Sequence, residues 1–233
     1  MIEVDRLMLE KYNINLFQMM ENAGRSLAIL GKELYLPDDL KNPKITILSG
    51  TGGNGGGGLV AGRRLANWGY KVIILLSKHY NDYKGIVSHQ LDILKNMNVD
   101  IVEFSKYIEE FKSDLIIDAL LGYNINGNPK LNTKKMIEWA MKRKKNDNTQ
   151  IISLDLPSGI GPNGEVYDPA IKADSTLTLA LPKVSMFKDE SKPYFGELYL
   201  ADISVPPMLY KSEKINLDVD FLFRKNDIIK ICE

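Results

Sequence analysis

The chain of 233 residues is long enough for one large domain or two small ones, and it needs no covalent or metal crosslinks for stability. Its hydrophobic residues (44%) and charged residues (26%) are those of an ordinary globular protein, which excludes a disordered, fibrous or low-complexity chain. The 30 Lys and Arg residues balance the 30 Asp and Glu residues, so no net charge attracts nucleic acid or an anionic membrane.

The single cysteine, Cys232, excludes an intrachain disulfide framework and a cysteine-based zinc site. The first ten residues carry Glu3, Asp5 and Arg6 and do not resemble a signal peptide. No apolar run approaches the roughly 20 residues that a membrane-spanning helix needs. We therefore expect a cytoplasmic protein that has no membrane partner.

Apolar runs alternate with helix-forming segments along most of the chain. In chain order we predict one or two helices over 3–36 with a break at Asn13-Ile-Asn15, a strand at 44–48, a helix at 59–68, a strand at 71–76, a helix at 86–97, a strand at 100–104, a helix at 105–112, a strand at 114–121, a helix at 133–144, and strands at 150–155, 175–181 and 196–203.

Continuous apolar strands, rather than alternating ones, are typical of a sheet that helices cover on both faces. Strand–helix alternation at this spacing favours right-handed βαβ units and a parallel, doubly wound sheet. The strands at 175–181 and 196–203 have no long helix between them, so we expect them to extend the sheet at one edge. Neither a linker nor a repeat divides the sequence, which predicts a single domain over 1–233.

Seven of the 18 glycines lie at 50–58, between a predicted strand and a predicted helix. At such a joint, backbone N–H groups and the helix dipole bind anions, although a flexible connector is the alternative. Gly50, Gly52 and Gly55 satisfy G-x-G-x-x-G, but the next strand lacks the terminal acid of an NAD dehydrogenase. Lys78 after that strand could bind a 2′-phosphate or simply be solvated, and no Walker lysine follows the glycines.

Asp118 and Asp155 each end a predicted buried strand and lead into a glycine-containing turn. The carboxyl ends of parallel strands form the ligand-binding edge of an open α/β sheet, and a buried carboxylate needs a partner. Each Asp alone could simply cap its turn, but two at equivalent strand ends favour a site. The glycine- and amide-rich loop 122–128 could supply further groups, as could Lys183, for which a solvated lysine is the alternative.

Five motifs occur in the order that is typical of one protein family. They are Met20-Glu-Asn-Ala-Gly24, the glycine cluster with Leu59-Val-Ala61, Asp118-Ala-Leu-Leu-Gly122, Asp155-Leu-Pro-Ser-Gly159 and Leu181-Pro-Lys183. In this order they resemble the YjeF N-terminal domain family, the NAD(P)H-hydrate epimerases. The similarity runs from about the first helix to Pro207.

The resemblance implies a Rossmann-like three-layer αβα sandwich with a mostly parallel central sheet and N-terminal helices, assembled as a homodimer. It implies an isomerase of nicotinamide cofactor repair that interconverts the R and S epimers of NADHX and NADPHX. A companion NAD(P)HX dehydratase uses the S form, so the resemblance also implies functional coupling to that enzyme.

By the family's pattern, a potassium ion is bound by Asn54, Asp118 and Ser158, whose oxygen atoms suit a hard cation. The N-terminal helices, including Glu21 and Asn22, are expected to cover the site. The residues expected to hold the substrate are Gly53, Asn54, Gly55, Gly56, Gly57, Gly122, Tyr123, Asn124, Ile125, Asn126, Gly127, Asn128 and Asp155.

Epimerisation requires a proton donor and acceptor at the reacting oxygen and stabilisation of an iminium-like intermediate. We expect Asp155 to be the acid/base or the substrate anchor, and Lys183 to be a second candidate for proton transfer. A catalytically silent ligand-binding or dimerisation module is the alternative, since Gly53 and Gly57 stand where the family's loop has Asn and Asp. A nucleotide- or cofactor-dependent transferase that uses the same glycine cluster is a third hypothesis.

Overall fold

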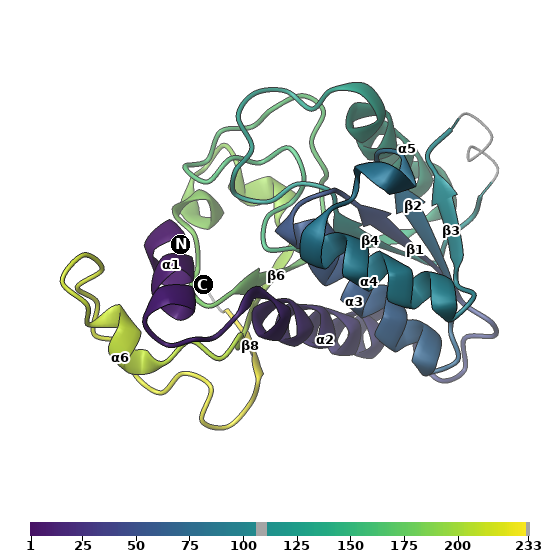
Figure 1. Cartoon of the computed structure of the whole chain (residues 1–233). Helices are drawn as coiled ribbons and strands as arrows, with labels where there is room; N and C mark the ends of the chain where they lie inside the picture. Colours follow the sequence, from purple (N-terminus) through teal and green to yellow (C-terminus); the bar gives the residue numbers. More distant parts are fainter. Residues whose placement is uncertain (106–110, 232–233) are drawn as a thin grey trace.

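A computed structural model describes residues 1–105 and 111–231 (Figure 1). An eight-stranded sheet lies at its centre, in the order β3-β2-β1-β4-β5-β6-β7-β8. Neighbouring strands are parallel except for β7 and β8, which are antiparallel. The strands are β1 (Lys44–Ser49), β2 (Lys71–Leu76), β3 (Asp100–Glu103), β4 (Leu115–Ala119), β5 (Gln150–Leu154), β6 (Ser175–Leu179), β7 (Glu197–Ala201) and β8 (Ile228–Lys230).

The α-helices of the described residues are α1 (Ile2–Glu10), α2 (Leu16–Tyr35), α3 (Gly53–Asn67), α4 (Gly85–Asn96), α5 (Leu131–Asp147) and α6 (Pro207–Tyr210). Short 3-10 helices lie at Tyr80–Asp82, Val184–Phe187 and Lys192–Tyr194. Among the described residues, no helix combines the length and the apolarity needed to cross a membrane.

Helices cover both faces of the sheet. The helices α2, α3 and α4 share one core cluster with Ile45 and Ile47 of β1, whereas α5 shares a second cluster with Leu48 of the same strand. Successive residues of a strand point to opposite faces, so β1 is buried on both sides. The arrangement is the predicted Rossmann-like αβα sandwich around a mostly parallel sheet.

The first helix, α1, lies outside these layers and beside α6 (Figure 1). Its buried residues Val4, Leu7 and Met8 form a separate apolar cluster with Leu209 and Tyr210 of α6. The segment that follows β7 therefore holds α1 in place.

The predicted elements that lie within the described residues are confirmed, with shifts of a few residues at their ends apart from the start of one helix. The predicted break before α2 is a capping box, in which Asn15 and Gln18 each accept a hydrogen bond from the other's backbone N–H. The short strand β8 was not predicted. The predicted helix at 105–112 lies largely outside the described residues.

The main difference concerns the helix after the glycine cluster, which begins at Gly53 rather than at Leu59. The glycines let the backbone of α3 approach its neighbours closely. A Cβ added at Gly55 would lie 1.7 Å from the carbonyl oxygen of Gly50, and one at Gly56 would lie 2.4 Å from Cε of Met20 in α2. A helix of larger residues could not pack this close to α2 and to the turn after β1.

We expect Gly55→Ala to lower the free energy of unfolding by about 3 kcal/mol, because the clash is with backbone that cannot rotate away. Gly53→Ala is the matched control in the same turn, since its added Cβ has no atom within 4 Å. It should leave stability unchanged or raise it by about 0.5–1 kcal/mol, because alanine favours helix. Urea unfolding followed by circular dichroism measures both, and equal values would contradict the packing explanation.

Candidate functional site

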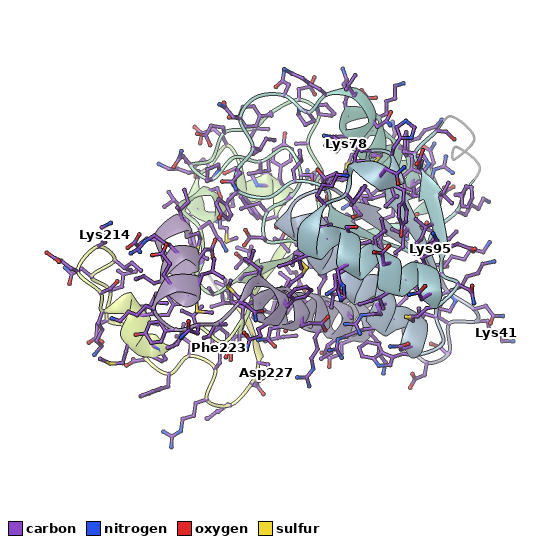
Figure 2. The ribbon with its side chains drawn as sticks, viewed as in Figure 1. Lys41, Lys78, Lys95, Lys214, Phe223 and Asp227 are labelled. Atoms are coloured by element: carbon purple, nitrogen blue, oxygen red, sulfur yellow. The ribbon has the colours of Figure 1, made fainter. Side chains whose placement is uncertain are left out.

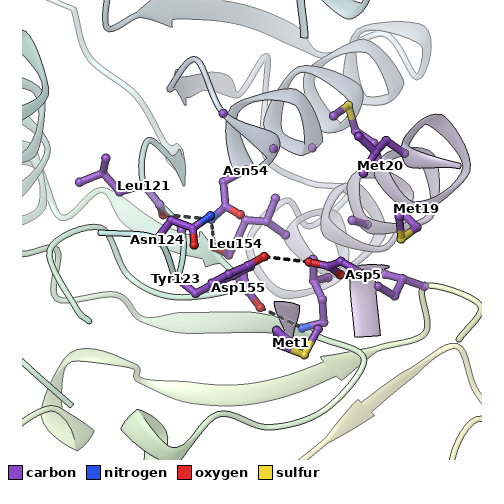
Figure 3. A pocket seen from close by; sticks show the side chains of 18 of the residues that line it. Met1, Asp5, Met19, Met20, Asn54, Leu121, Tyr123, Asn124, Leu154 and Asp155 are labelled. Carbon is purple, nitrogen blue, oxygen red and sulfur yellow. Dashed lines mark hydrogen bonds between the residues drawn. The ribbon is translucent and has the colours of Figure 1, made fainter. Parts of the chain in front are cut away.

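A cavity of about 510 Å³ opens beside the amino terminus of α3, at the carboxyl ends of β1, β4 and β5. Residues of α1, of α2, of the start of α3 and of the turns after β4 and β5 line it (Figure 3). Open α/β sheets bind their ligands at this edge. The fold therefore places a candidate binding site where the sequence predicted one.

Asp118, near the carboxyl end of β4, is 1% exposed. Ser153 Oγ and the backbone N–H of Ser158 each donate to its Oδ2 at 2.8 Å, and Ser158 Oγ donates to its Oδ1 at 2.5 Å. Burial raises the pKa of the Asp118 carboxyl, and these hydrogen bonds oppose that rise. The carboxyl group thus ties the end of β4 to the turn after β5.

Asn54, in the first turn of α3, links this helix to the chain after β4 and to the end of β5. Its side-chain amide donates to the carbonyl of Leu121 at 2.9 Å and to that of Leu154 at 2.8 Å (Figure 3). The N–H of Leu121 in turn donates to Ser158 Oγ at 3.0 Å. The three predicted cation ligands, Asn54, Asp118 and Ser158, are therefore linked through one group of hydrogen bonds.

These three residues offer a carboxylate, an amide and a hydroxyl, and such oxygen donors suit a hard cation. The described residues contain no group of three His, Cys, Asp or Glu side chains that could hold a metal. A donor set with a single carboxylate balances the charge of a monovalent ion better than that of a divalent one. The chemistry of the set therefore fits potassium.

Asp155 follows β5 and lines the cavity, with a φ of 65° that residues other than glycine seldom adopt. Lys183 Nζ pairs with its Oδ1, and it also donates to Thr178 Oγ1 and to the Leu179 carbonyl, each at 2.8 Å. The side chains of Lys183 and Asp155 are only 6% and 5% exposed. The Lys183 ammonium group thus holds the Asp155 side chain in place beside the cavity.

A second carboxyl group, that of Asp5 in α1, lines the same cavity. Tyr123 Oη donates to Asp5 Oδ2 at 2.8 Å (Figure 3). Burial raises the pKa of Asp5, and the charge of Asp155 adds to the rise. The hydrogen bond from Tyr123 and the positive charges of the amino terminus and Lys183 oppose it. Burial and the bond to Asp5 also raise the pKa of the Tyr123 phenol.

The structure brings only part of the predicted substrate-binding set to this cavity. Those that line it are Gly53, Asn54, Gly57, Gly122, Tyr123, Asn124, Ile125 and Asp155. Gly55 and Gly56 are buried in α3 instead, where they allow close packing. Residues 126–128 line a neighbouring cavity of about 850 Å³, which also has Lys78, exposed after β2, in its wall (Figure 2).

Glu21 and Asn22 do not line the cavity, contrary to expectation. The Glu21 carboxylate accepts hydrogen bonds from Arg63 Nη2 at 2.5 and 2.6 Å and from Gln90 Nε2 at 3.1 Å. These bonds tie α2 to α3 and α4, which gives Glu21 a structural role. The cover that α2 provides comes from Leu16, Met19, Met20 and Ala23.

Sequence reasoning missed Asp5, because no motif surrounds it. The available signal was weak: Asp5 lies three residues before the buried Met8 in an amphipathic helix. The acidic side chain therefore lies toward the buried side of α1, and only the tertiary structure brings it to the cavity.

The fold and this cavity define a Rossmann-like α/β protein with a ligand site at the carboxyl edge of its sheet. The chain belongs to the family described as YjeF-related protein N-terminus, whose family model matches residues 16–185. This match confirms the resemblance on which the site residues were predicted.

A relative from Dehalogenimonas lykanthroporepellens, named NAD(P)H-hydrate epimerase, is 38% identical over 214 residues that cover 90% of this chain and 82% of the relative. A relative from Dictyoglomus turgidum, named bifunctional NAD(P)H-hydrate repair enzyme Nnr, is 33% identical over 84% of this chain, which spans 37% of that protein's length. The crystal structure of yeast ynu0 (YNL200c) has a TM-score of 0.82 at 21% identity, with 99% of this chain and 96% of that one covered, and thus has the same fold.

Lys183→Met should lower the free energy of unfolding by about 3–5 kcal/mol, because it leaves the Asp155 carboxylate buried without its cation. The double variant Asp155→Asn/Lys183→Met should lose less than the two single variants together. Lys144→Met is the control, since its pair with Asp174 is more exposed and should contribute about 1 kcal/mol or less. Additive losses in urea unfolding would show that the buried pair is not coupled.

Proposed function

We propose that the chain is an NAD(P)H-hydrate epimerase, which interconverts the R and S epimers of NADHX and NADPHX. The observation that carries the proposal is the buried Asp155–Lys183 pair beside a cavity at the amino terminus of α3. The family and the printed names of the relatives support it.

In this proposal the substrate spans both cavities. The amino terminus of α3, where Gly52 and Gly53 are exposed, offers N–H groups and a positive dipole end to the pyrophosphate. The two cavities share Leu121, Asn124 and Ile125, which makes the loop 122–128 a continuous wall for an extended dinucleotide. The hydrated ring would then lie in the cavity that Asp155 lines.

Asp155 is the acid/base at the hydroxyl-bearing carbon. Its carboxylate, held by Lys183, takes the proton of the incoming water and returns it in the reverse direction. Lys183 donates to three acceptors, which fixes its ammonium in place and favours a role in positioning Asp155.

A potassium ion held by Asn54, Asp118 and Ser158 would supply a fixed positive charge next to the substrate's phosphates. The residues themselves fix the two turns that line the cavity, through the hydrogen bonds at Asp118. A singly charged ion in this position would offset the buried Asp118 carboxylate.

The silent-module alternative rested on Gly53 and Gly57. A Cβ added at Gly57 would lie 2.6 Å from Cδ2 of Leu154, which is the far end of a flexible side chain, and one added at Gly53 would have no atom within 4 Å. Both glycines therefore stand where the backbone leaves room at the start of α3. No observation on the described residues favours a silent module over the enzyme.

We also propose that residues 1–233 form a single YjeF N-terminal-like domain, which acts in the cytoplasm as a homodimer. The continuous sheet over β1 to β8 supports the single domain. The name of the bifunctional relative supports coupling to an NAD(P)HX dehydratase, which would use the S epimer that this chain produces.

Incubation of the protein with R-NADHX and an S-specific dehydratase should speed cofactor recovery beyond the spontaneous rate. Asp155→Asn should lower kcat by about 10²- to 10⁴-fold, because it removes the acid/base. Asp218→Asn, an exposed Asp-to-Asn change, is the matched control and should be fully active. A wild-type protein without acceleration at high concentration would reject the proposed function.

KCl should raise the melting temperature more than equal concentrations of NaCl or tetramethylammonium chloride do, because a bound ion stabilises the folded state. Each kcal/mol of stabilisation corresponds to about 2–4 °C for a chain of this size. Ser158→Ala should abolish the potassium-specific rise, whereas Ser88→Ala on α4 should keep it. Identical melting curves in all three salts would remove potassium from the proposal.

A further inference from the structure

We propose that Asp5 and Tyr123 form a second acid–base pair, which transfers protons to and from the substrate in the cavity that Asp155 lines. The inference rests on the proposed function and adds two catalytic residues to it. Asp5 reaches the cavity from α1 and Asp155 reaches it from the end of β5, so two carboxyl groups from different elements line the same cavity.

Inversion at one carbon needs a proton donor for the departing hydroxyl and a proton acceptor for the incoming water. In the first step the acid donates a proton to the departing hydroxyl oxygen. The C–O bond then breaks and water leaves from one face, as the ring nitrogen's electron pair forms an iminium. Water then adds to the other face, the new C–O bond forms and the water's extra proton passes to a base. The overall reaction consumes nothing, and in reverse the acid and the base exchange roles.

The contacts of Asp5 suit the role of acid. Its Oδ2 lies 2.8 Å from Tyr123 Oη, and both residues line the cavity (Figure 3). When Asp5 is protonated, its O–H donates to the Tyr123 oxygen and frees the phenol proton for the substrate. Burial raises the pKa of Asp5, which keeps the carboxyl protonated to higher pH, whereas the Asp155 carboxyl group pairs with Lys183.

The charged groups that face Asp5 come from several elements. Asp155 from the end of β5 raises its pKa, and Lys183 and the amino terminus lower it. On α1 itself, Glu10 pairs with Arg6 on an exposed surface. Glu10 is therefore a carboxyl group on the same helix that does not line the cavity.

The test measures R-to-S epimerisation by wild type, Asp5→Asn, Tyr123→Phe and the double variant, with R-NADHX and an S-specific dehydratase. Each single variant should lose about 10²-fold or more in kcat with KM within a few-fold, and the double variant should lose no more than the worse single variant. In the wild type, deprotonation of Asp5 should lower kcat at high pH. This fall should be absent in Asp5→Asn.

Two matched controls accompany these variants. Glu10→Gln changes a carboxylate to an amide on α1, and Tyr80→Phe removes a hydrogen bond of 2.7 Å between Tyr80 and Asp92, neither of which lines either cavity. Both should keep wild-type kcat. Melting temperatures separate catalysis from folding, and if Asp5→Asn unfolds, Tyr123→Phe, which removes a single oxygen atom, decides the question.

The outcomes are distinct. If the wild type is active and both Asp5→Asn and Tyr123→Phe keep more than a third of its kcat, the second acid–base pair is overturned. The proposed function then still stands. Losses in KM alone also overturn it, since they indicate binding rather than proton transfer. An inactive wild type rejects the proposed function, and the second pair with it.

Discussion

The buried carboxyl group of Asp118 is the interaction on which the site depends. It accepts hydrogen bonds from Ser153 on β5 and from Ser158 in the next turn, so two parallel strands end in a fixed relation to each other. Asn54 links the same turns to α3. A buried polar group with all its partners rigidifies its surroundings, and here it fixes the edge of the sheet that faces the cavity.

The layers and the mostly parallel direction of the strands follow from features that a sequence displays. Continuous apolar strands and intervening helices predict a parallel sheet covered on both faces, and Asp118 and Asp155 at strand ends predict its functional edge. These features are local or periodic, which is why they can be read from one chain. The start of α3 could not be predicted in the same way, because glycine disfavours a helix. The close contacts that explain glycine at positions 55 and 56 are visible only in the structure.

Tertiary contacts decided the rest of the site. Asp5 lies in no motif, and the position of α1 beside the cavity depends on its packing against Met19 of α2 and against α6. Glu21 belongs to a recognisable motif, yet its carboxylate turns to Arg63 and joins two helices. The motif thus located a segment that packs beside the cavity but did not show which way each of its side chains points. The strand β8 was too short, at three residues, to give a periodic signal.

The packing of α1 against α6 connects a segment late in the chain to one wall of the cavity. Val4, Leu7 and Met8 are buried against Leu209 and Tyr210, so the segment after β7 supports the helix that carries Asp5. Of the described residues in that segment, Ile203 alone lines this cavity. The position of the wall that α1 forms is therefore set partly by side chains that have no contact with the space it encloses.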